Sequence, residues 1–479
     1  MKTYGHYING EEIISSTTFE DLNPYTGEIF ALAARGNAQD ANKAVTAARA
    51  GFEKWSGLPP AERERAMLKA ADLLEARVDS LVEILIDESG SVITKARGEV
   101  LYSASLIRAA AGEVRRLYGD TFPNDKPHRL SMVIREPLGV VVAISPFNAP
   151  LSLLVKMIAF ALGAGNAVVA KPSEETPVIA LELAKVMNEA GLPSGTFNVV
   201  TGFGAEVGPA LIESSDVNGI AFTGSTSTGI SIAQSAIKTM KRMQMELGGK
   251  NPLVVLKDVD IEEAAEIAAA GAFFHGGQIC MSSARIIVEK EIARPFAEAL
   301  ARKAKSLQLG DLRNPQTAYG PVINQRSLEK IQGHVQSARD AGAEILAGGD
   351  VYRGLIYQPT VIWEPPRTCA LWNEETFGPV TAVVAVNDLE EAIALANESE
   401  YGLSAGVLTN DMIRGMTAAR RIRCGAVHVG MHSFQSDSMA PVGGFGMSGF
   451  GRSGGQYSVE HFTELKWISL ELGKTPRPF

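Results

Sequence analysis

Cysteine is scarce in this sequence. The chain has 479 residues and only three cysteines, Cys280, Cys369 and Cys424, and none of them belongs to a CxxC pair. An odd, widely spaced set of cysteines in a long chain argues against a disulfide framework and against a zinc site. We therefore expect a reducing, cytoplasmic location and no structural metal.

Blocks of like charge are also missing. The 45 basic and 54 acidic side chains give a formal net charge of −9, and they are dispersed along the chain. A surface for nucleic acid or for an anionic membrane therefore has no electrostatic support. Small molecules are the expected partners.

The sequence has no clear secretory signal or membrane span. The start, MKTYGHYINGEE, lacks an apolar signal segment and reads as a short strand with a turn at Asn9-Gly10. Residues 151–170 are almost continuously apolar and about long enough to span a bilayer, but Lys156 and Asn166 interrupt them. A buried helix, a glycine turn and a strand explain this segment better.

The length and patterning that are present predict a two-domain α/β protein. A chain of 479 residues exceeds the usual size of one hydrophobic core. Helical periodicity dominates the first hundred or so residues, at 38–52, 60–74, 79–88 and 98–116. Short β-rich runs alternating with helical segments follow, at 140–144, 167–170, 196–200, 219–222, 252–256, 284–288, 381–386 and 405–408. This alternation predicts parallel sheets, with a boundary near Gly248-Gly249.

Two segments carry reactive side chains next to glycines. In GGQICMSSAR, Cys280 follows a glycine pair and precedes a β-rich run, so its thiol could be exposed at a turn. In MELGGKNP, Glu246 precedes a kinked Leu-Gly-Gly stretch that could aim a carboxylate into a crevice. Taken alone, a buried structural cysteine and a solvated glutamate explain these segments as well or better.

Two further segments offer hydrogen-bond donors. In AISPFNAP, Asn148 lies between two prolines at the end of a strand, where its amide could donate to a developing oxyanion; an Asx turn is the simpler alternative. FTGSTSTG follows a strand and opens a helix near Thr226, so it could bind a phosphate or only cap that helix. GFGAEVG, at 202–208, departs from the usual dinucleotide GxGxxG spacing and is weak evidence.

Together, these segments resemble those of the aldehyde dehydrogenase superfamily. Their order and the spacing between Glu246 and Cys280 match that family, and the likeness runs over almost the whole chain. Further matching segments are KPSEETP at 171–177, EETFGPV at 374–380, NESEYGLSAG at 397–406 and GGFGMSGFGR at 443–452.

The resemblance implies a mechanism. Cys280 would attack the aldehyde carbon, while the Asn148 amide and the Cys280 backbone N–H hold the oxyanion of the thiohemiacetal. Hydride transfer to a nicotinamide would leave a thioester. Glu246 would be the general base that activates Cys280 and the water that hydrolyses the thioester. Relatives that pass the acyl group to coenzyme A generally lack this base, so a free acid is the expected product.

The resemblance also implies a site for NAD. Lys171 and Glu174 would contact the adenosine ribose hydroxyls, and a carboxylate at this place would repel the 2′-phosphate of NADP. Ser225, with the backbone of Gly224, would bind the pyrophosphate. The other cofactor residues that the resemblance implies are Gly204 beside the adenine, Phe147, and Glu375 and Phe377 at the nicotinamide ribose and ring. It implies neither a flavin nor a metal.

Departures from the common pattern bear on the substrate. Ala149 stands where an aromatic residue commonly follows the asparagine, Val442 stands where an aromatic residue often follows a proline, and Gly446 replaces a frequent lysine. These changes predict an apolar pocket roomy enough for a ring, as in the branch that oxidises benzaldehyde, vanillin or salicylaldehyde. Further candidate pocket residues, each of which plain packing also explains, are Phe274, Tyr102 and His432.

The fold that the resemblance implies is α/β, with two doubly wound parallel domains and a small β oligomerisation flap. The expected divisions are an NAD-binding domain at 1–118 and 138–248, a catalytic domain at 249–457, and the flap at 119–137 and 458–479. Residues 463–470 read as an edge strand, which calls for a partner, so we expect a dimer or tetramer.

Three rival interpretations remain open from the sequence. An aliphatic or semialdehyde dehydrogenase of the same fold would need a basic residue for a distal carboxylate, for which Lys156 and Arg108 are candidates. A catalytically silent structural member is disfavoured by the intact set of Cys280, Glu246 and Asn148. A cysteine hydrolase would need a histidine partner, and His275 lies close to Cys280 in the sequence.

Overall fold

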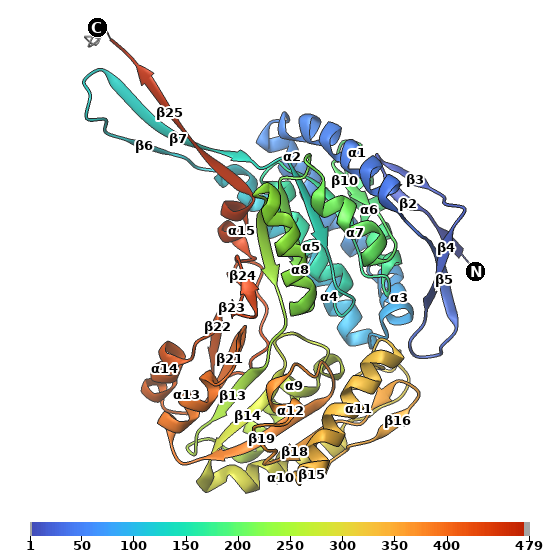
Figure 1. The fold of residues 1–479 in the computed structure, drawn as a ribbon, viewed down its shortest axis with the longest axis vertical. Helices are drawn as coiled ribbons and strands as arrows, with labels where there is room; N and C mark the ends of the chain where they lie inside the picture. The colour runs from blue at the N-terminus through green and yellow to red at the C-terminus, as the bar shows by residue number, and fades with distance from the viewer. Residues whose placement is uncertain (1, 474–479) are drawn as a thin grey trace.

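The computed structural model describes residues 2–473 as two α/β bodies and a projecting β arm (Figure 1). The body drawn in blue and green contains the first large sheet, and the body drawn in yellow and orange contains the second. The arm leaves the first body beside α15 (Gly455–His461). The predicted α/β class is confirmed.

The first sheet has eight strands in the order β24-β12-β11-β8-β9-β10-β2-β3. Five neighbouring strands of this sheet, β12, β11, β8, β9 and β10, are parallel. The Val, Ile and Ala side chains of β8 and β9 are buried on both faces of the sheet, so both faces need to be covered by helices. The chain starts in the middle at β8, runs outward through β9 and β10, and crosses back to β11. This reversal creates a crevice at the carboxyl ends of β8 and β11. The strands are β24 (Gly449–Phe450), β12 (Arg242–Glu246), β11 (Gly219–Thr223), β8 (Val140–Ile144), β9 (Ala167–Lys171), β10 (Phe197–Val199), β2 (His6–Ile8) and β3 (Glu11–Ile13).

Eight helices cover this sheet. They are α1 (Ala38–Ser56), α2 (Pro60–Ala76), α3 (Val78–Ser89), α4 (Ile93–Glu113), α5 (Pro150–Gly163), α6 (Pro177–Ala190), α7 (Gly204–Glu213) and α8 (Thr226–Ala236). Proline occupies the first position of α2, α5 and α6. It costs no hydrogen bond there, because the first N–H groups of a helix have no acceptor within the helix. Almost every side chain of α5 is buried, so the apolar segment at 151–170 is a core helix followed by β9, as the sequence predicted.

The helical pattern that the sequence predicts for the first hundred residues holds only from Ala38. Residues before it form strands β1 (Lys2–Tyr4), β2, β3, β4 (Thr18–Leu22) and β5 (Ile29–Ala34). These strands are three to six residues long and mix buried with exposed positions, so they carry little periodic signal. The predicted turn at Asn9-Gly10 is present between β2 and β3, with φ of 57° and 84°.

The second sheet has seven strands in the order β15-β18-β19-β14-β13-β21-β22, and only β15 is antiparallel to its neighbour. The strands are β13 (Asn251–Val255), β14 (Ser283–Glu289), β15 (Glu344–Ala347), β18 (Thr360–Trp363), β19 (Val380–Val386), β21 (Ser404–Leu408) and β22 (Ala426–Val429). The helices around it are α9 (Ile261–Phe273), α10 (Lys290–Ser306), α11 (Gln325–Asp340), α12 (Ala370–Asn373), α13 (Leu389–Asn397) and α14 (Met412–Arg421). The four strands that the sequence predicted here are present, and β15, β18 and β22 were missed.

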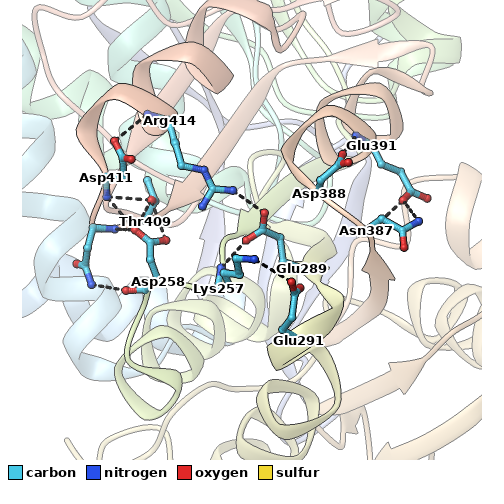
Figure 2. A network of polar contacts seen from close by, with 11 residues as sticks. Lys257, Asp258, Glu289, Glu291, Asn387, Asp388, Glu391, Thr409, Asp411 and Arg414 are labelled. Atoms are coloured by element: carbon cyan, nitrogen blue, oxygen red, sulfur yellow. Dashed lines mark hydrogen bonds and ion pairs between the residues drawn. The ribbon is translucent and has the colours of Figure 1, made fainter.

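The carboxyl ends of β13, β14, β19 and β21 are closed by polar side chains (Figure 2). Asp258 accepts hydrogen bonds from the Thr409 hydroxyl at 2.8 Å and from the Asp411 backbone N–H at 2.9 Å. Glu289 accepts from the Lys257 backbone N–H at 2.8 Å and from the Arg414 guanidinium at 2.5 Å. This end of the second sheet is therefore sealed by contacts within the protein.

The arm is a three-stranded antiparallel sheet in the order β25-β7-β6. Its strands are β6 (Asp120–Phe122), β7 (Arg129–Pro137) and β25 (Thr463–Glu471). The register of β25 on β7 runs from Thr463 opposite Pro137 to Glu471 opposite Arg129, and the other edge of β25 is unpaired within residues 2–473. The edge strand predicted at 463–470 is present. The last part of the predicted flap, 474–479, lies outside the described residues.

Candidate active site

Cys280 lies in a turn between a short 3₁₀ segment, Phe274–Gly277, and β14. The chain before it turns sharply, because His275, Gly276 and Gly277 all have positive φ. A Cβ on Gly277 would lie 2.0 Å from the Gly378 carbonyl oxygen, so this position requires glycine. The glycine pair noticed in the sequence therefore shapes the loop that carries the partly buried thiol.

Asn251, which the sequence analysis did not single out, braces this loop from β13. Its amide donates to the Cys280 carbonyl at 2.8 Å and to the Ser282 carbonyl at 3.0 Å, and its oxygen accepts from the Ser404 backbone N–H at 3.1 Å. The neighbouring Gly-Gly-Lys motif gave the only signal for this residue. The contacts fix the backbone on both sides of the thiol.

The thiol opens onto a cavity of about 350 Å³ between α4, α5 and the loop at 434–442. Four predicted pocket residues, Tyr102, Ala149, Phe274 and Val442, line it together with Cys280 and Asn148. The sequence analysis missed other lining residues, among them Lys95, Glu99, Phe434 and Gln435. His432 does not line the cavity but stacks on Phe434, with ring centroids 6.1 Å apart.

Asn148 follows β8 at the crevice and is buried, with 4% of its surface exposed. Its side-chain N–H donates to the Gln278 carbonyl at 2.8 Å, which leaves the second N–H of the amide for another acceptor. Its backbone carbonyl accepts a hydrogen bond from Lys95 at 2.9 Å. Both ends of the residue are held, so the amide direction is fixed.

Lys95 and Glu99 form a buried ion pair on α4 that reaches the same loop. The ammonium of Lys95 donates to Glu99 at 2.5 Å, to Ser91 at 2.9 Å and to the Asn148 carbonyl. The other oxygen of Glu99 accepts the backbone N–H groups of Leu151 and Ser152 at the start of α5. One ion pair thus connects the Asn148 carbonyl to the N-terminus of α5.

Glu246 is buried at the carboxyl end of β12, with 7% of its surface exposed, and does not itself line the cavity. Its carboxylate lies 3.9 Å from the ammonium of Lys156, which does line the cavity. Its backbone carbonyl accepts from the Gly224 N–H at 3.1 Å, which connects β12 to the turn after β11. Among residues 2–473, no hydrogen bond joins the Glu246 carboxylate to the Cys280 thiol.

Burial raises the pKa of the Cys280 thiol to about 12, and the carboxylates of Glu246 and Glu375 act in the same direction. Lys156 opposes them. A thiol with this pKa is protonated near neutral pH, so attack on a carbonyl requires a base or a nearby positive charge. Both carboxylates therefore disfavour the thiolate in this arrangement, and Lys156 favours it.

The predicted adenosine residues lie at the carboxyl ends of the first sheet. Lys171 ends β9, is 3% exposed, and donates to Glu174 at 3.1 Å. Burial lowers the pKa of Lys171, and Glu174 partly restores it. Gly204 begins α7, where a Cβ would meet no atom within 4 Å. The carboxyl end of β9 therefore carries a cation and a carboxylate.

Gly224 and Ser225 form the turn between β11 and α8. Ser225 caps α8 by accepting the Thr228 N–H at 3.3 Å, and the helix begins directly after the carboxyl end of β11. A Cβ on Gly224 would lie 2.5 Å from the Phe222 ring, so glycine is required for this close turn. Free N–H groups at a helix N-terminus are suited to an anion such as a pyrophosphate.

Glu375, Phe377 and Phe147 come from two segments that are far apart in the chain and meet in the fold. Glu375 accepts the Gly249 N–H at 3.0 Å, and a Cβ on Gly248 would lie 2.8 Å from its carboxylate. The Phe147 and Phe377 rings meet edge to face, with centroids 5.9 Å apart. The structure therefore brings together residues that the sequence placed on different segments.

Two other candidates from the sequence, Arg108 and His275, do not contact the Cys280 thiol. Arg108 is on the outer side of α4, where it pairs with Asp72 at 2.8 Å and with Glu75, so the prediction that it serves a distal carboxylate is wrong. His275 is buried, and burial lowers its pKa well below the usual value. No hydrogen bond joins its ring to Cys280 within residues 2–473.

Two searches of the described part of the chain were negative. Between residues 2 and 473, no helix combines the length and apolarity needed to cross a membrane. In the same part, no group of three or more His, Cys, Asp or Glu side chains could hold a metal ion.

The fold and site together define an α/β protein in which the carboxyl ends of one parallel sheet lie beside a partly buried thiol. Residues 13–468 match the Aldehyde dehydrogenase family, and the chain belongs to that family. It is 37% identical to salicylaldehyde dehydrogenase of Pseudomonas sp. (strain C18) over 99% of both chains. It is 38% identical to 3-sulfolactaldehyde dehydrogenase of Priestia aryabhattai over 98% of this chain and 99% of that one. Among solved structures, an NAD-dependent aldehyde dehydrogenase from Sinorhizobium meliloti superposes with a TM-score of 0.97 at 36% identity, covering 100% of this chain and 96% of that one.

Proposed function

We propose that this protein oxidises an aldehyde to a carboxylate with NAD as the hydride acceptor. The observation that carries the proposal is the placement of Cys280 and Asn148 on one cavity. Lys171, Glu174 and Ser225 follow or end parallel strands of the first sheet at the same edge as Asn148. Family membership agrees with this chemistry.

The crevice fits a dinucleotide. The α8 N-terminus at Ser225 offers N–H groups to a pyrophosphate, and Glu174 offers a carboxylate to ribose hydroxyls but repels a 2′-phosphate. Phe147, Phe377 and Glu375 would hold the nicotinamide end beside the thiol. When bound, NAD would supply an acceptor for one hydride. The relative from Sinorhizobium meliloti is NAD-dependent, which supports the same cofactor here.

The residues of the chain then have the following roles in the proposed reaction. Glu246 takes the thiol proton, and the Cys280 sulfur bonds to the aldehyde carbon. The free N–H of Asn148 and the Cys280 backbone N–H stabilise the oxyanion. The thioester would be hydrolysed next. Glu246, after passing the thiol proton to solvent, would take a proton from the water that attacks the thioester carbon. The carbon–sulfur bond would then break, releasing the acid, and the Cys280 sulfur would regain a proton.

An aromatic aldehyde fits the cavity best. Phe274 and Phe434 stack with centroids 5.5 Å apart at 29°, which leaves a flat apolar wall. Ala149 and Val442 keep the space beside this wall open. The similarity to a salicylaldehyde dehydrogenase supports a ring substrate. The second candidate is an anionic aliphatic aldehyde, which Lys156 in the cavity and the similarity to a 3-sulfolactaldehyde dehydrogenase favour.

The arm is proposed to pair subunits into a dimer or tetramer. β25 has an unpaired edge and exposes Leu465, Trp467 and Leu470, a combination that favours association. Light scattering of wild type and Trp467→Glu tests the pairing, because loss of the edge contact would leave monomers.

The proposed divisions of the chain are an NAD-binding domain at 1–118 and 138–248, a catalytic domain at 249–457, and the flap at 119–137 and 458–479. A cytoplasmic location is also proposed, in keeping with three free cysteines.

The decisive experiment follows NADH formation with a panel of aldehydes. Wild type and Cys280→Ala are compared with benzaldehyde-type, short aliphatic and semialdehyde substrates, and the best substrate is repeated with NADP. We expect aromatic aldehydes to react fastest, with NAD preferred and no turnover in the variant. A much higher kcat/KM for acetaldehyde than for benzaldehydes would contradict the aromatic assignment. Absence of NADH with every aldehyde, despite NAD binding, would favour a silent member.

A further inference from the structure

Gln278 is a buried amide in the loop that carries Cys280. Only 1% of its surface is exposed, and it lies two residues before the thiol. Its side-chain nitrogen donates to the His275 carbonyl at 3.3 Å and to the Pro321 carbonyl at 3.2 Å, and its side-chain oxygen accepts from the Ile323 backbone N–H at 3.0 Å. An amide has two N–H donors, so both donors and the acceptor oxygen of this side chain are engaged.

Two of these partners belong to residues 320–324, a segment of the second body that contacts the first. The Asn324 side chain donates to Glu175 of the first body at 2.7 Å. A Cβ on Gly320 would lie 2.1 Å from the Gly90 carbonyl oxygen, so the two backbones are in close contact there. The amide is therefore anchored to a segment that is itself held in place.

The backbone of Gln278 holds a proposed oxyanion donor. Its carbonyl accepts the side-chain N–H of Asn148 at 2.8 Å, and its own N–H donates to the His275 carbonyl at 3.2 Å. The other proposed donor, the Cys280 backbone N–H, follows two residues later in the same loop. Gln278 therefore connects the Asn148 amide, through the loop, to residues 320–324.

The Asn251 amide braces the same loop on the far side of Gln278. It donates to the Cys280 and Ser282 carbonyls at 2.8 Å and 3.0 Å. Removal of the Gln278 side chain would leave these contacts with β13 intact. The part of the loop that depends on Gln278 is thus the part that contacts Asn148.

We propose that Gln278 is a positioning residue that directs the Asn148 amide towards the oxyanion, an inference that rests on the proposed oxidation at Cys280. A displacement of about 1 Å at a reacting centre costs about 10²-fold in rate. The oxyanion develops only during the reaction, so the loss of direction falls on kcat more than on KM.

A double-mutant cycle with Asn148 tests the inference. Gln278→Met, which keeps the length of the side chain but removes its polar atoms, should lower kcat for the best aldehyde by about 10-fold to 100-fold, with a smaller change in KM. In the Asn148→Ala background the same substitution should lower kcat by less than about threefold, because the donor that Gln278 directs is gone. An equal factor in both backgrounds would overturn the inference, since Gln278 would then support only the fold.

Gln244→Met is the matched control. Gln244 is also buried, with 2% of its surface exposed, and its amide donates to the Arg452 carbonyl at 2.6 Å. Whatever its effect on kcat, the factor should be the same with Asn148 and with Asn148→Ala. If the control shows the same dependence on Asn148 as Gln278→Met, the cycle reports a general loss of stability and the inference is overturned.

A crystal structure of Gln278→Met decides the inference without turnover. The Asn148 amide should change direction, while residues 280–282 keep their contacts with Asn251; an unchanged Asn148 would overturn the inference. If Gln278→Met does not fold, Gln278→Glu replaces it with the same expectations, because it keeps the oxygen that accepts from Ile323 and loses the amide donors. Failure of every aldehyde to react with wild type would refute the proposed function, and the structure would still decide the role of Gln278.

Discussion

The two large sheets present opposite ends to the site. In the first sheet, Asn148, Lys171, Ser225 and Glu246 all follow or end parallel strands, so the site lies at the carboxyl ends. In the second sheet, Cys280 and the Glu375–Phe377 segment precede β14 and β19, so the site lies at the amino ends. The carboxyl ends of the second sheet are closed by the Asp258 and Glu289 contacts (Figure 2).

The difference shows how one architecture serves two purposes. Parallel sheets usually bind ligands beyond their carboxyl ends, and the first sheet follows this rule with open N–H groups and a carboxylate. The second sheet has its polar groups satisfied at that end, which makes it a rigid support. Its amino-end loops then carry the reactive groups. We therefore expect substitutions at the carboxyl ends of the first sheet and the amino ends of the second sheet to abolish activity. Substitutions at the carboxyl ends of the second sheet should reduce stability alone.

The largest effect is expected at the amino-end loop. Cys280→Ala should lower the rate of NADH formation by roughly 10³-fold or more, because the covalent step is lost. Initial rates with the best aldehyde measure it. Cys424→Ala, a buried thiol elsewhere in the same body, is the control and should keep its activity. Comparable loss in both variants would point to unfolding.

The next largest effect is expected at the carboxyl end of β12. Glu246→Gln should lower kcat by about 10² to 10⁴-fold, because general base catalysis of deacylation is removed. If thioester hydrolysis becomes limiting, rapid mixing should reveal a burst of NADH followed by a slow phase. Unchanged steady-state turnover would exclude Glu246 as the base.

A smaller effect is expected at the Lys95–Glu99 pair that holds Asn148. Lys95→Met should lower kcat by roughly tenfold to a hundredfold with a smaller change in KM, because the oxyanion donor is displaced. Alkylation of Cys280 by iodoacetamide should keep its rate, since the thiol itself is untouched. Lys95→Arg should recover part of kcat. If alkylation slowed by the same factor as kcat, the substitution would have disturbed the structure around Cys280 as well.

The smallest effect is expected at the sealed end. Asp258→Ala should lower the free energy of unfolding by about 1–2 kcal/mol through lost hydrogen bonds, with kcat unchanged. Burial opposes ionisation of Asp258, but hydrogen bonds from Thr409, Asn410 and Asp411 outweigh it and lower the pKa below 3.8. The stabilisation is therefore present above pH 3.8 and is lost as the pH falls through the folded pKa. Urea unfolding of wild type and Asp258→Ala at several pH values measures the difference in the free energy of unfolding. A loss of kcat in Asp258→Ala would show that the carboxyl end of the second sheet also affects catalysis.

The sequence by itself determined the local structure and the chemically reactive segments. The runs at 140–144 and 167–170 are buried strands because their side chains are continuously apolar, and Asn9-Gly10 forms a turn because both residues tolerate positive φ. Glycines before Cys280 and after Glu246 are required by backbone oxygens, which lie 2.0 Å from a Cβ on Gly277 and 2.5 Å from a Cβ on Gly249. Such local requirements can be recognised in the sequence because they restrict which residue types a position accepts.

The tertiary structure alone decided which charges meet in the cavity. Lys95 and Glu99 have the spacing of an ordinary surface ion pair, and Arg108 on the same helix remains on the surface. Packing of α4 against α5 buries the first pair and places Lys156 on the cavity, 3.9 Å from Glu246. Burial depends on contacts between segments far apart in the chain, so the residues next to a lysine or arginine in the sequence do not show whether its charge lies in the interior or on the surface.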